Sequence, residues 1–209
     1  MSQSSQLSHI FKSRENILLQ LEKQGYNVDS YSGFNMGEVN SMFQARQMDM
    51  LLKKEDDAKN VYVKYHLSKA IRHNNLYEYI EDLFQLEEVL TNKYELIIIV
   101  KDEPNEPILK TVKHIWKQDG IMVTLYNIKR LQFNILDHEL VPPHRVLTNE
   151  EAEAVRQKYN IKNNLQMPGM TRFNPVSLAI GIRPGEICEI TRKSKSAISA
   201  PFYRICEDE

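Results

Sequence analysis

The sequence predicts two domains: an α/β N-terminal domain, with an open mixed sheet and flanking helices, and a small α+β C-terminal domain. The prediction of the first domain rests on two apolar runs, Leu96–Val100 and Ile121–Tyr126, with an amphipathic helical pattern between them. Strand, helix and strand in this order are typical of a βαβ unit. The second rests on a change near Leu136, after which short helical patterns mix with strand-like segments. We therefore expect domains at residues 1–136 and 137–209.

The N-terminal elements follow from the spacing of apolar side chains. Residues 8–24 place apolar side chains on one helical face, and Gly25 is expected to end that helix. A weaker helical pattern covers residues 38–47. Residues 50–52 and 61–65 have strand-like composition and flank a charged segment, which predicts a β-hairpin with a charged turn.

The central elements have stronger patterns. An amphipathic helix is expected over residues 76–90, because apolar side chains recur there every three or four positions. The run Leu96–Val100 is continuously apolar and predicts a strand buried on both faces. The next helix covers residues 108–116 and ends by Gly120, and residues 121–126 form the following strand.

Capping chemistry marks the main helix of the C-terminal domain. Thr148 and Glu151 have the spacing of a capping box, in which each side chain bonds the backbone N–H of the other residue. The pattern predicts a helix that runs through Tyr159. Ala152, Val155 and Tyr159 are expected to face the core.

Turn residues and alternation predict the other C-terminal elements. A short helix over residues 176–180 is expected to close at Gly181. Residues 187–191 and 202–206 alternate as strands, and the polar segment 192–199 between them is predicted to be a hairpin loop.

Composition excludes several classes of protein. The 209 residues include 27 Lys plus Arg and 28 Asp plus Glu, and 42% are hydrophobic, which is not the balance of a disordered chain or a histone-like polycation. No apolar run approaches the roughly 20 residues that cross a bilayer, so no membrane association is expected. The only two cysteines, Cys188 and Cys206, are predicted to be buried free thiols in a reducing compartment, with a disulfide between them as the alternative.

Motifs for catalysis, cofactors and metals are missing, so no residue is assigned to those roles. His138, Glu139 and His144 lack the one-turn spacing of a zinc-protease helix, and Pro142 breaks any helix between them. No glycine-rich phosphate loop or serine nucleophile elbow occurs. The string from Asp57 to Lys59 fits a metal-dependent nuclease but lies in the charged turn. A nuclease-like or nucleotide-binding enzyme on the α/β domain therefore stays an alternative.

A basic cluster occupies the predicted C-terminal hairpin. Arg192, Lys193 and Lys195 lie in the loop, and Arg204 lies on the following strand. Such a cluster could meet an acidic protein surface or nucleic acid, or could simply be solvated. Composition and spacing leave these interpretations open.

Several short blocks follow one another in the C-terminal domain. In chain order they are His138-Glu139-Leu140-Val141-Pro142-Pro143-His144, Leu147-Thr148-x-Glu150-Glu151, Tyr159-x-Ile161, Asn174-Pro175-Val176, Gly181-Ile182-x-x-Gly185-Glu186, Ile190-x-Arg192-Lys193-Ser194 and Tyr203-Arg204-Ile205-Cys206.

The order and spacing of these blocks resemble the small assembly subunit shared by eukaryotic nuclear RNA polymerases, a family that also occurs in archaeal RNA polymerases. The sequence departs from that family at Asn174, where Asp is usual, and at Pro184, where a basic residue is usual. The N-terminal domain is similar to the family's jaw-type domain only in length, element order and position. That divergence suits a version encoded by a large DNA virus.

The resemblance implies a non-catalytic subunit of a multisubunit DNA-directed RNA polymerase. Its C-terminal domain would anchor to the largest subunit and contact other subunits, and its N-terminal domain would form part of the lower jaw beside downstream duplex DNA. The DNA contact would be weak and not sequence-specific. The residues implied to bind the largest subunit are His138, Glu139, Val141, Pro142, His144, Arg192, Lys193, Ser194, Tyr203 and Arg204.

Two further expectations accompany the resemblance. Residues 138–142 would form a rigid extended strand leading into the domain. Localisation would follow the polymerase: the nucleus for a cellular protein, and a cytoplasmic viral factory or the virion for a viral one. A free transcription regulator that docks on polymerase is a further alternative.

Overall fold

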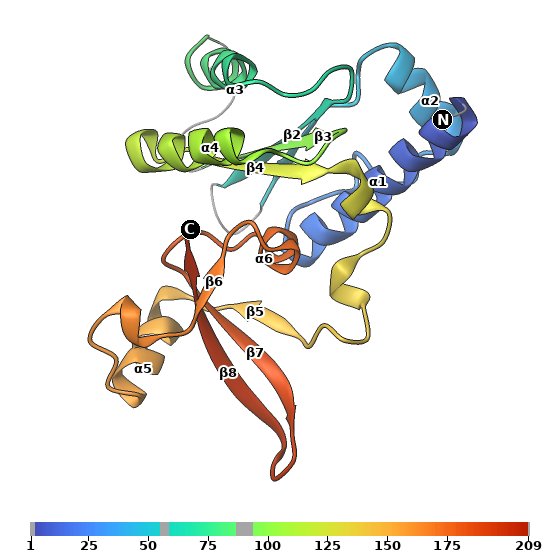
Figure 1. The fold of residues 1–209 in the computed structure, drawn as a ribbon. Coiled ribbons are helices and arrows are strands. Elements are labelled where there is room, and N and C mark those ends of the chain that lie inside the picture. Colours follow the sequence, from blue (N-terminus) through green and yellow to red (C-terminus); the bar gives the residue numbers. More distant parts are fainter. Residues whose placement is uncertain (1–2, 55–58, 87–93, 209) are drawn as a thin grey trace. The chain divides into compact units, whose positions relative to one another are not determined.

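The computed structural model describes residues 3–54, 59–86 and 94–208 (Figure 1). The chain divides into two compact units, Met1–Phe133 and Asn134–Glu209. Each unit contains its own four-stranded sheet, the first mixed and flanked by helices, the second combined with short helices. This arrangement confirms the predicted fold class, an α/β part followed by an α+β part.

The first unit is built on a mixed sheet of four strands: β1 (Met50–Lys53), β2 (Asn60–His66), β3 (Glu95–Val100) and β4 (Met122–Asn127). The strand order is β1-β2-β3-β4, with β1 antiparallel to β2 and the other neighbours parallel. Every residue of β3 and β4 is buried, as expected for parallel strands covered on both faces. The predicted βαβ unit and the antiparallel β1–β2 pair are confirmed. The predicted turn residues 55–58 lie outside the described residues.

Helical segments accompany this sheet: α1 (Gln3–Lys23), α2 (Met36–Gln44), α3 (His73–Ile80), η1 (Glu81–Leu86), α4 (Glu106–Asp119) and η2 (Ile128–Leu131). α1 begins earlier than predicted, because its first residues are polar and give no apolar signal. It ends at the predicted glycine: Gly25 has φ +90°, and the N–H of Tyr26 donates to the carbonyl of Leu21 at 3.0 Å. α4 likewise ends at Gly120, with φ +67°.

The helix predicted over residues 76–90 is shorter and less regular than its pattern indicated. α3 gives way to η1, a π-helical segment, and residues 87–93 lie outside the described residues. Leu76, Ile80 and Leu83 are buried, so the apolar spacing was a sound guide to the buried face. Spacing does not distinguish an α turn from a π turn, because both keep neighbouring apolar residues on one side.

The second unit has a sheet of four strands: β5 (His144–Val146), β6 (Gly169–Thr171), β7 (Ile187–Ser194) and β8 (Ile198–Glu207). The strand order is β5-β7-β8-β6. β7 is antiparallel to both neighbours, and β6 runs parallel to β8. β7 and β8 are the longest strands and form a two-stranded ribbon, drawn in red in Figure 1.

Its helical segments are η3 (Ile135–Asp137), α5 (Asn149–Lys158), η4 (Asn164–Gln166) and α6 (Pro175–Ile180). The capping box is confirmed: the N–H of Glu151 donates to Thr148 Oγ1 at 3.3 Å, and the N–H of Thr148 donates to Glu151 Oε2 at 2.9 Å. Val155 is buried as predicted, but the prediction for Tyr159 was wrong. Its side chain is 50% exposed, because α5 ends at Lys158 and Tyr159 is the C-cap residue.

The polar segment 192–199 was predicted to be a loop, and this was wrong. β7 continues to Ser194 and β8 starts at Ile198, so only residues 195–197 form the turn. Lys193 pairs with Ser199 in the register of the ribbon. The hydrogen bonds between strands are made by backbone groups, so two strands can stay paired beyond the residues with alternating apolar side chains, where both faces of the ribbon are exposed.

Two apolar clusters form the core on opposite faces of this sheet. One combines β-strand residues with residues of α5, and its members are Leu147, Val155, Met167, Ile187 and Ile205. The other has the members Met170, Ile182, Cys188, Ile190 and Cys206, with Ile180 of α6 packed against it. Within the described segments, no helix is long and apolar enough to cross a membrane.

Candidate protein-interaction surface

The alternation of side chains along β7 and β8 separates residues that are adjacent in sequence. Arg192 and Ser194 lie on the face that also carries Ile190, whereas Lys193 lies on the opposite face. On β8, Arg204 pairs with Cys188 and therefore shares the first face, and Tyr203 shares the second. The residues implied to bind a partner thus occupy two faces.

The first face carries two arginines around one aromatic ring. The guanidinium carbon of Arg192 lies 4.0 Å from the centroid of the Phe202 ring, and that of Arg204 lies 5.6 Å from it. Arg204 also donates from Nη1 to the carbonyl of Gly169 at 2.6 Å. Across the described residues, neither arginine forms an ion pair with a carboxylate. Both charges are therefore available to a partner.

His144 adds a titratable group to this face. It pairs with Ile190 in the register of β5 and β7, and its Nδ1 lies 2.6 Å from the carbonyl oxygen of Pro142. Burial lowers the pKa of His144, and the positive charges of Arg192 and Arg204 lower it further, against the opposing effect of the Pro142 carbonyl. We call His144, Arg192, Phe202 and Arg204 the basic face.

The residues before β5 form a turn and not the extended strand expected for residues 138–142. The N–H of Val141 donates to the carbonyl of His138 at 2.8 Å, and the N–H of Leu140 donates to His138 Nδ1 at 3.2 Å. His138 and Glu139 are exposed, and Leu140 is 83% exposed. Pro142 is half-buried, and the backbone is extended only from His144. Local hydrogen bonds between residues 138 and 141 therefore stabilise this turn.

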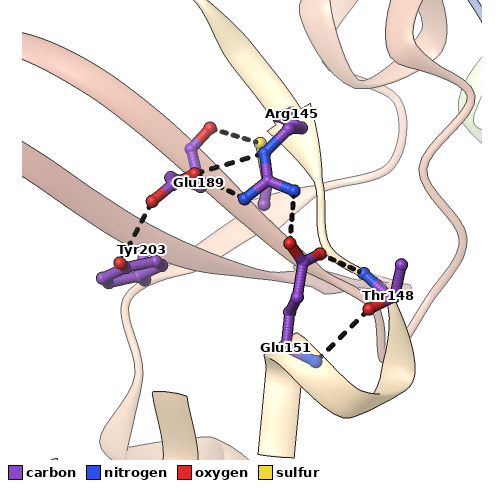
Figure 2. Close-up of polar contacts among 6 residues, drawn as sticks. Arg145, Thr148, Glu151, Glu189 and Tyr203 are labelled. Carbon is purple, nitrogen blue, oxygen red and sulfur yellow. Dashed lines mark hydrogen bonds and ion pairs between the residues drawn. The ribbon is translucent and has the colours of Figure 1, made fainter. Parts of the chain in front are cut away.

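A polar network on the second face was missed by the sequence analysis (Figure 2). Arg145 donates from Nη1 to Glu151 at 2.7 Å and from Nη2 to Glu189 at 2.9 Å, and the hydroxyl of Tyr203 donates to Glu189 at 3.1 Å. The network joins β5, β7 and β8 to the capping box at Thr148 (Figure 2). The sequence did contain one signal for this network. Arg145 directly follows His144 on the same strand, so its side chain must point to the opposite face of the sheet from that of His144. Tyr203, implied to bind a partner, takes part in this internal network.

A buried arginine was also missed. Arg172 is 2% exposed, and its Nε lies 2.9 Å from Asp208 Oδ1. Its backbone N–H donates to the carbonyl of Glu207 at 3.0 Å. These contacts attach the end of the chain to the segment between β6 and α6.

Asn174, which departs from the usual Asp, still caps α6 by accepting from the N–H of Val176 at 2.9 Å.

Cys188 and Cys206 are free and buried, as predicted. Burial raises the pKa of Cys188 to about 11 and that of Cys206 to about 12. Both thiols are therefore protonated and shielded, which is the state of structural cysteines.

Within the described residues, no group of three or more His, Cys, Asp or Glu side chains could hold a metal ion. Asp57 of the nuclease-like string lies outside the described residues.

The C-terminal part of the chain is similar to known proteins. The family described as "RNA polymerase Rpb5, C-terminal domain" matches residues 133–206. DNA-directed RNA polymerase subunit Rpo5 of Thermococcus kodakarensis is 41% identical over 78 residues, which cover 37% of this chain and 94% of the relative. The Rpo5 subunit of Archaeoglobus fulgidus is 41% identical over 75 residues, which cover 36% of this chain and 97% of the relative. The Rpo5 subunit of Methanosarcina acetivorans is 40% identical over 74 residues, which cover 35% of this chain and 94% of the relative.

These relatives are subunits of DNA-directed RNA polymerases. The matched stretch includes every block of the resemblance from His138 to Cys206. This chain belongs to the Rpb5 family of RNA polymerase subunits, with the second unit as the family's C-terminal domain.

Proposed function

We propose that this chain is a structural subunit of a multisubunit DNA-directed RNA polymerase, without an active site of its own, and that its C-terminal unit binds the largest subunit. Family membership supports the first part. The basic face supports the second, because two arginines without carboxylate partners are suited to acidic groups on another protein.

The chemistry of the basic face favours a protein partner that carries carboxylates. An arginine that lies on an aromatic ring has a restricted orientation, so it loses less conformational freedom when it binds a carboxylate. Arg192 is in this position above Phe202. His144 has a lowered pKa and stays largely neutral near pH 7, so the arginines supply the charge.

We further propose that the first unit forms part of the lower jaw, beside downstream duplex DNA. The near balance of 27 basic and 28 acidic residues supports a weak contact, made mainly to phosphates and held in place by the rest of the polymerase.

A tagged pull-down tests the assignment. The full chain is expressed in its native source, purified in high salt and quantified by mass spectrometry. The two largest polymerase subunits are expected at about equal molar amounts with the tagged chain, as in a stoichiometric assembly. Recovery of the chain alone would refute the assignment. Substoichiometric polymerase that is lost in salt would instead indicate a free regulator.

Charge reversal tests the basic face. Arg192→Glu is expected to weaken the association with the largest subunit at least about tenfold, because it places a carboxylate where a carboxylate should bind. Lys110→Glu, an exposed position on α4, is the charge-matched control. Equal retention of both variants in the polymerase would contradict a role for the basic face.

A further inference from the structure

β8 has an open edge along its first half. β6 pairs with β8 only through Gly169–Thr171 against Ile205–Glu207. The N–H of Ile205 donates to the carbonyl of Pro168 at 3.1 Å, which is the last bond of that ladder. Pro168 has no N–H, so it cannot donate to the carbonyl of Tyr203, the next outward group along β8. The ladder therefore stops at a proline, before the strand does.

The alternation of the ladder shows which backbone groups this edge presents. Cys206 bonds toward the β7 side, through Glu186, whereas Ile205 bonds outward, to Pro168. Odd-numbered residues of β8 therefore direct their backbone groups away from β7. The N–H and carbonyl of Tyr203 and the carbonyl of Pro201 point outward, and within the described segments no backbone hydrogen bond reaches them from that side.

An apolar groove with a volume of about 370 Å³ lies beside this edge. The rings of Tyr159 and Tyr203 lie on it with their centroids 5.8 Å apart. Tyr159 follows the end of α5 and is half exposed, so its ring is accessible at the groove. Ile161, Met167, Pro168 and Pro201 contribute further lining.

Charges around the groove favour an acidic ligand. Lys158 Nζ lies 5.5 Å from the centroid of the Tyr159 ring, which lines the groove. The nearby carboxylate of Glu189 is already bonded to Arg145 and to the Tyr203 hydroxyl. Lys158 therefore offers a ligand a positive charge beside the groove.

We propose that the open edge of β8 receives an extended segment of another polymerase subunit as an added strand. Main-chain bonds at Tyr203 and Pro201 would hold the segment, an apolar side chain would enter the groove, and a carboxylate would meet Lys158. Pro201 supplies no N–H, so the added strand is short. This inference rests on the proposed function, which supplies the partner. The groove lies on the side of Tyr203, and Phe202 is the member of the basic face that also borders it.

Hydrogen exchange at single amides tests the added strand without any substitution. In the isolated chain, the amide of Tyr203 should exchange with solvent much faster than those of Phe202 and Arg204, which bond to β7. In polymerase purified from the native source, Tyr203 should slow at least about tenfold while its neighbours change little. Fragmentation by electron transfer in the mass spectrometer resolves these positions.

The outcomes separate the two proposals. Stoichiometric polymerase with an unprotected Tyr203 amide overturns the added strand and leaves the subunit assignment intact. Absence of the chain from polymerase overturns both. Protection in the isolated chain that grows with its concentration shows that a second copy occupies the edge, which also overturns the proposed occupant.

A pair of variants at one position separates the backbone from the ring. Tyr203→Pro removes the outward N–H and the ring, whereas Tyr203→Thr removes the ring and keeps the N–H. Threonine should therefore retain the polymerase at least about tenfold better than proline, with circular dichroism confirming that both fold. Equal retention would contradict the added strand. If the proline variant fails to fold, the exchange experiment on the unmodified chain still decides.

Discussion

The two buried thiols give a sensitive measure of how well the second unit stays folded. Cys188 and Cys206 are shielded from solvent, and burial raises their pKa values to about 11 and about 12. In an unfolded chain a thiol has a pKa near 8.5, so at about pH 8 a large fraction is thiolate, the reactive form. In the folded unit that fraction is lower by roughly two to three powers of ten.

The expected effect on reactivity is smaller than the change in thiolate fraction. A thiolate of higher pKa is a better nucleophile, which offsets roughly one to one and a half powers of ten. Ionisation alone should therefore slow both thiols by about 10- to 100-fold, and burial should slow them further by denying access to the reagent.

An aromatic disulfide reagent such as Ellman's provides the assay, with the chain in native buffer and in concentrated guanidinium chloride. The native rate should keep rising with pH beyond about pH 9, whereas the unfolded rate should level off near the ordinary thiol pKa. Native and unfolded rates within about threefold of each other, or a native plateau near pH 8.5, would refute the buried, protonated state. Because the folded pKa values are the higher ones, this contribution to stability is present below about pH 8.5 and is lost as pH rises toward 11 and 12.

The same labelling reports on contacts elsewhere in the unit. Asp208→Asn removes the negative charge that lies 2.9 Å from Nε of the buried Arg172, so the free energy of opening should fall by about 3 kcal/mol and labelling of Cys206 should speed up about 100-fold. Glu153→Gln, at an exposed position of α5, is its control, and equal rates for the two variants would contradict the ion pair. Thr148→Ala removes the N-cap of α5 and should lower the free energy of opening by about 1 kcal/mol, so labelling should become roughly fivefold faster. An unchanged labelling rate would show that α5 does not depend on this cap.

Residue patterns predicted most of the secondary structure because the determinants are local. Gly25 and Gly120 end their helices through a positive φ, and the pair Thr148 and Glu151 begins α5 through two hydrogen bonds. These effects act over a few residues and are visible in the sequence. The outward position of Tyr159 was not predictable from helical spacing, because it depends on where α5 ends.

Contacts between distant segments account for what the sequence analysis missed at the site. Arg145 meets Glu189 only because β5 pairs with β7 in one register, and Arg172 meets Asp208 only because the chain end returns beside β6. Neither pair has a fixed spacing in the sequence. A strand register can be inferred from alternation only after the pairing partner is known.

The resemblance block that contains Arg192, Lys193 and Ser194 shows why a continuous motif need not be a continuous surface. In a strand, successive side chains point to opposite faces, so this block places Arg192 on the basic face and Lys193 on the opposite face. A partner that bound only the face of Arg192 and Ser194 would leave Lys193 without contacts. The two proposals together therefore require partner segments on both faces of the β7–β8 ribbon, with carboxylates against Arg192 and an added strand at Tyr203. The large, permanent interface of a resident subunit is consistent with that arrangement, and the small contact of a transient regulator is less so.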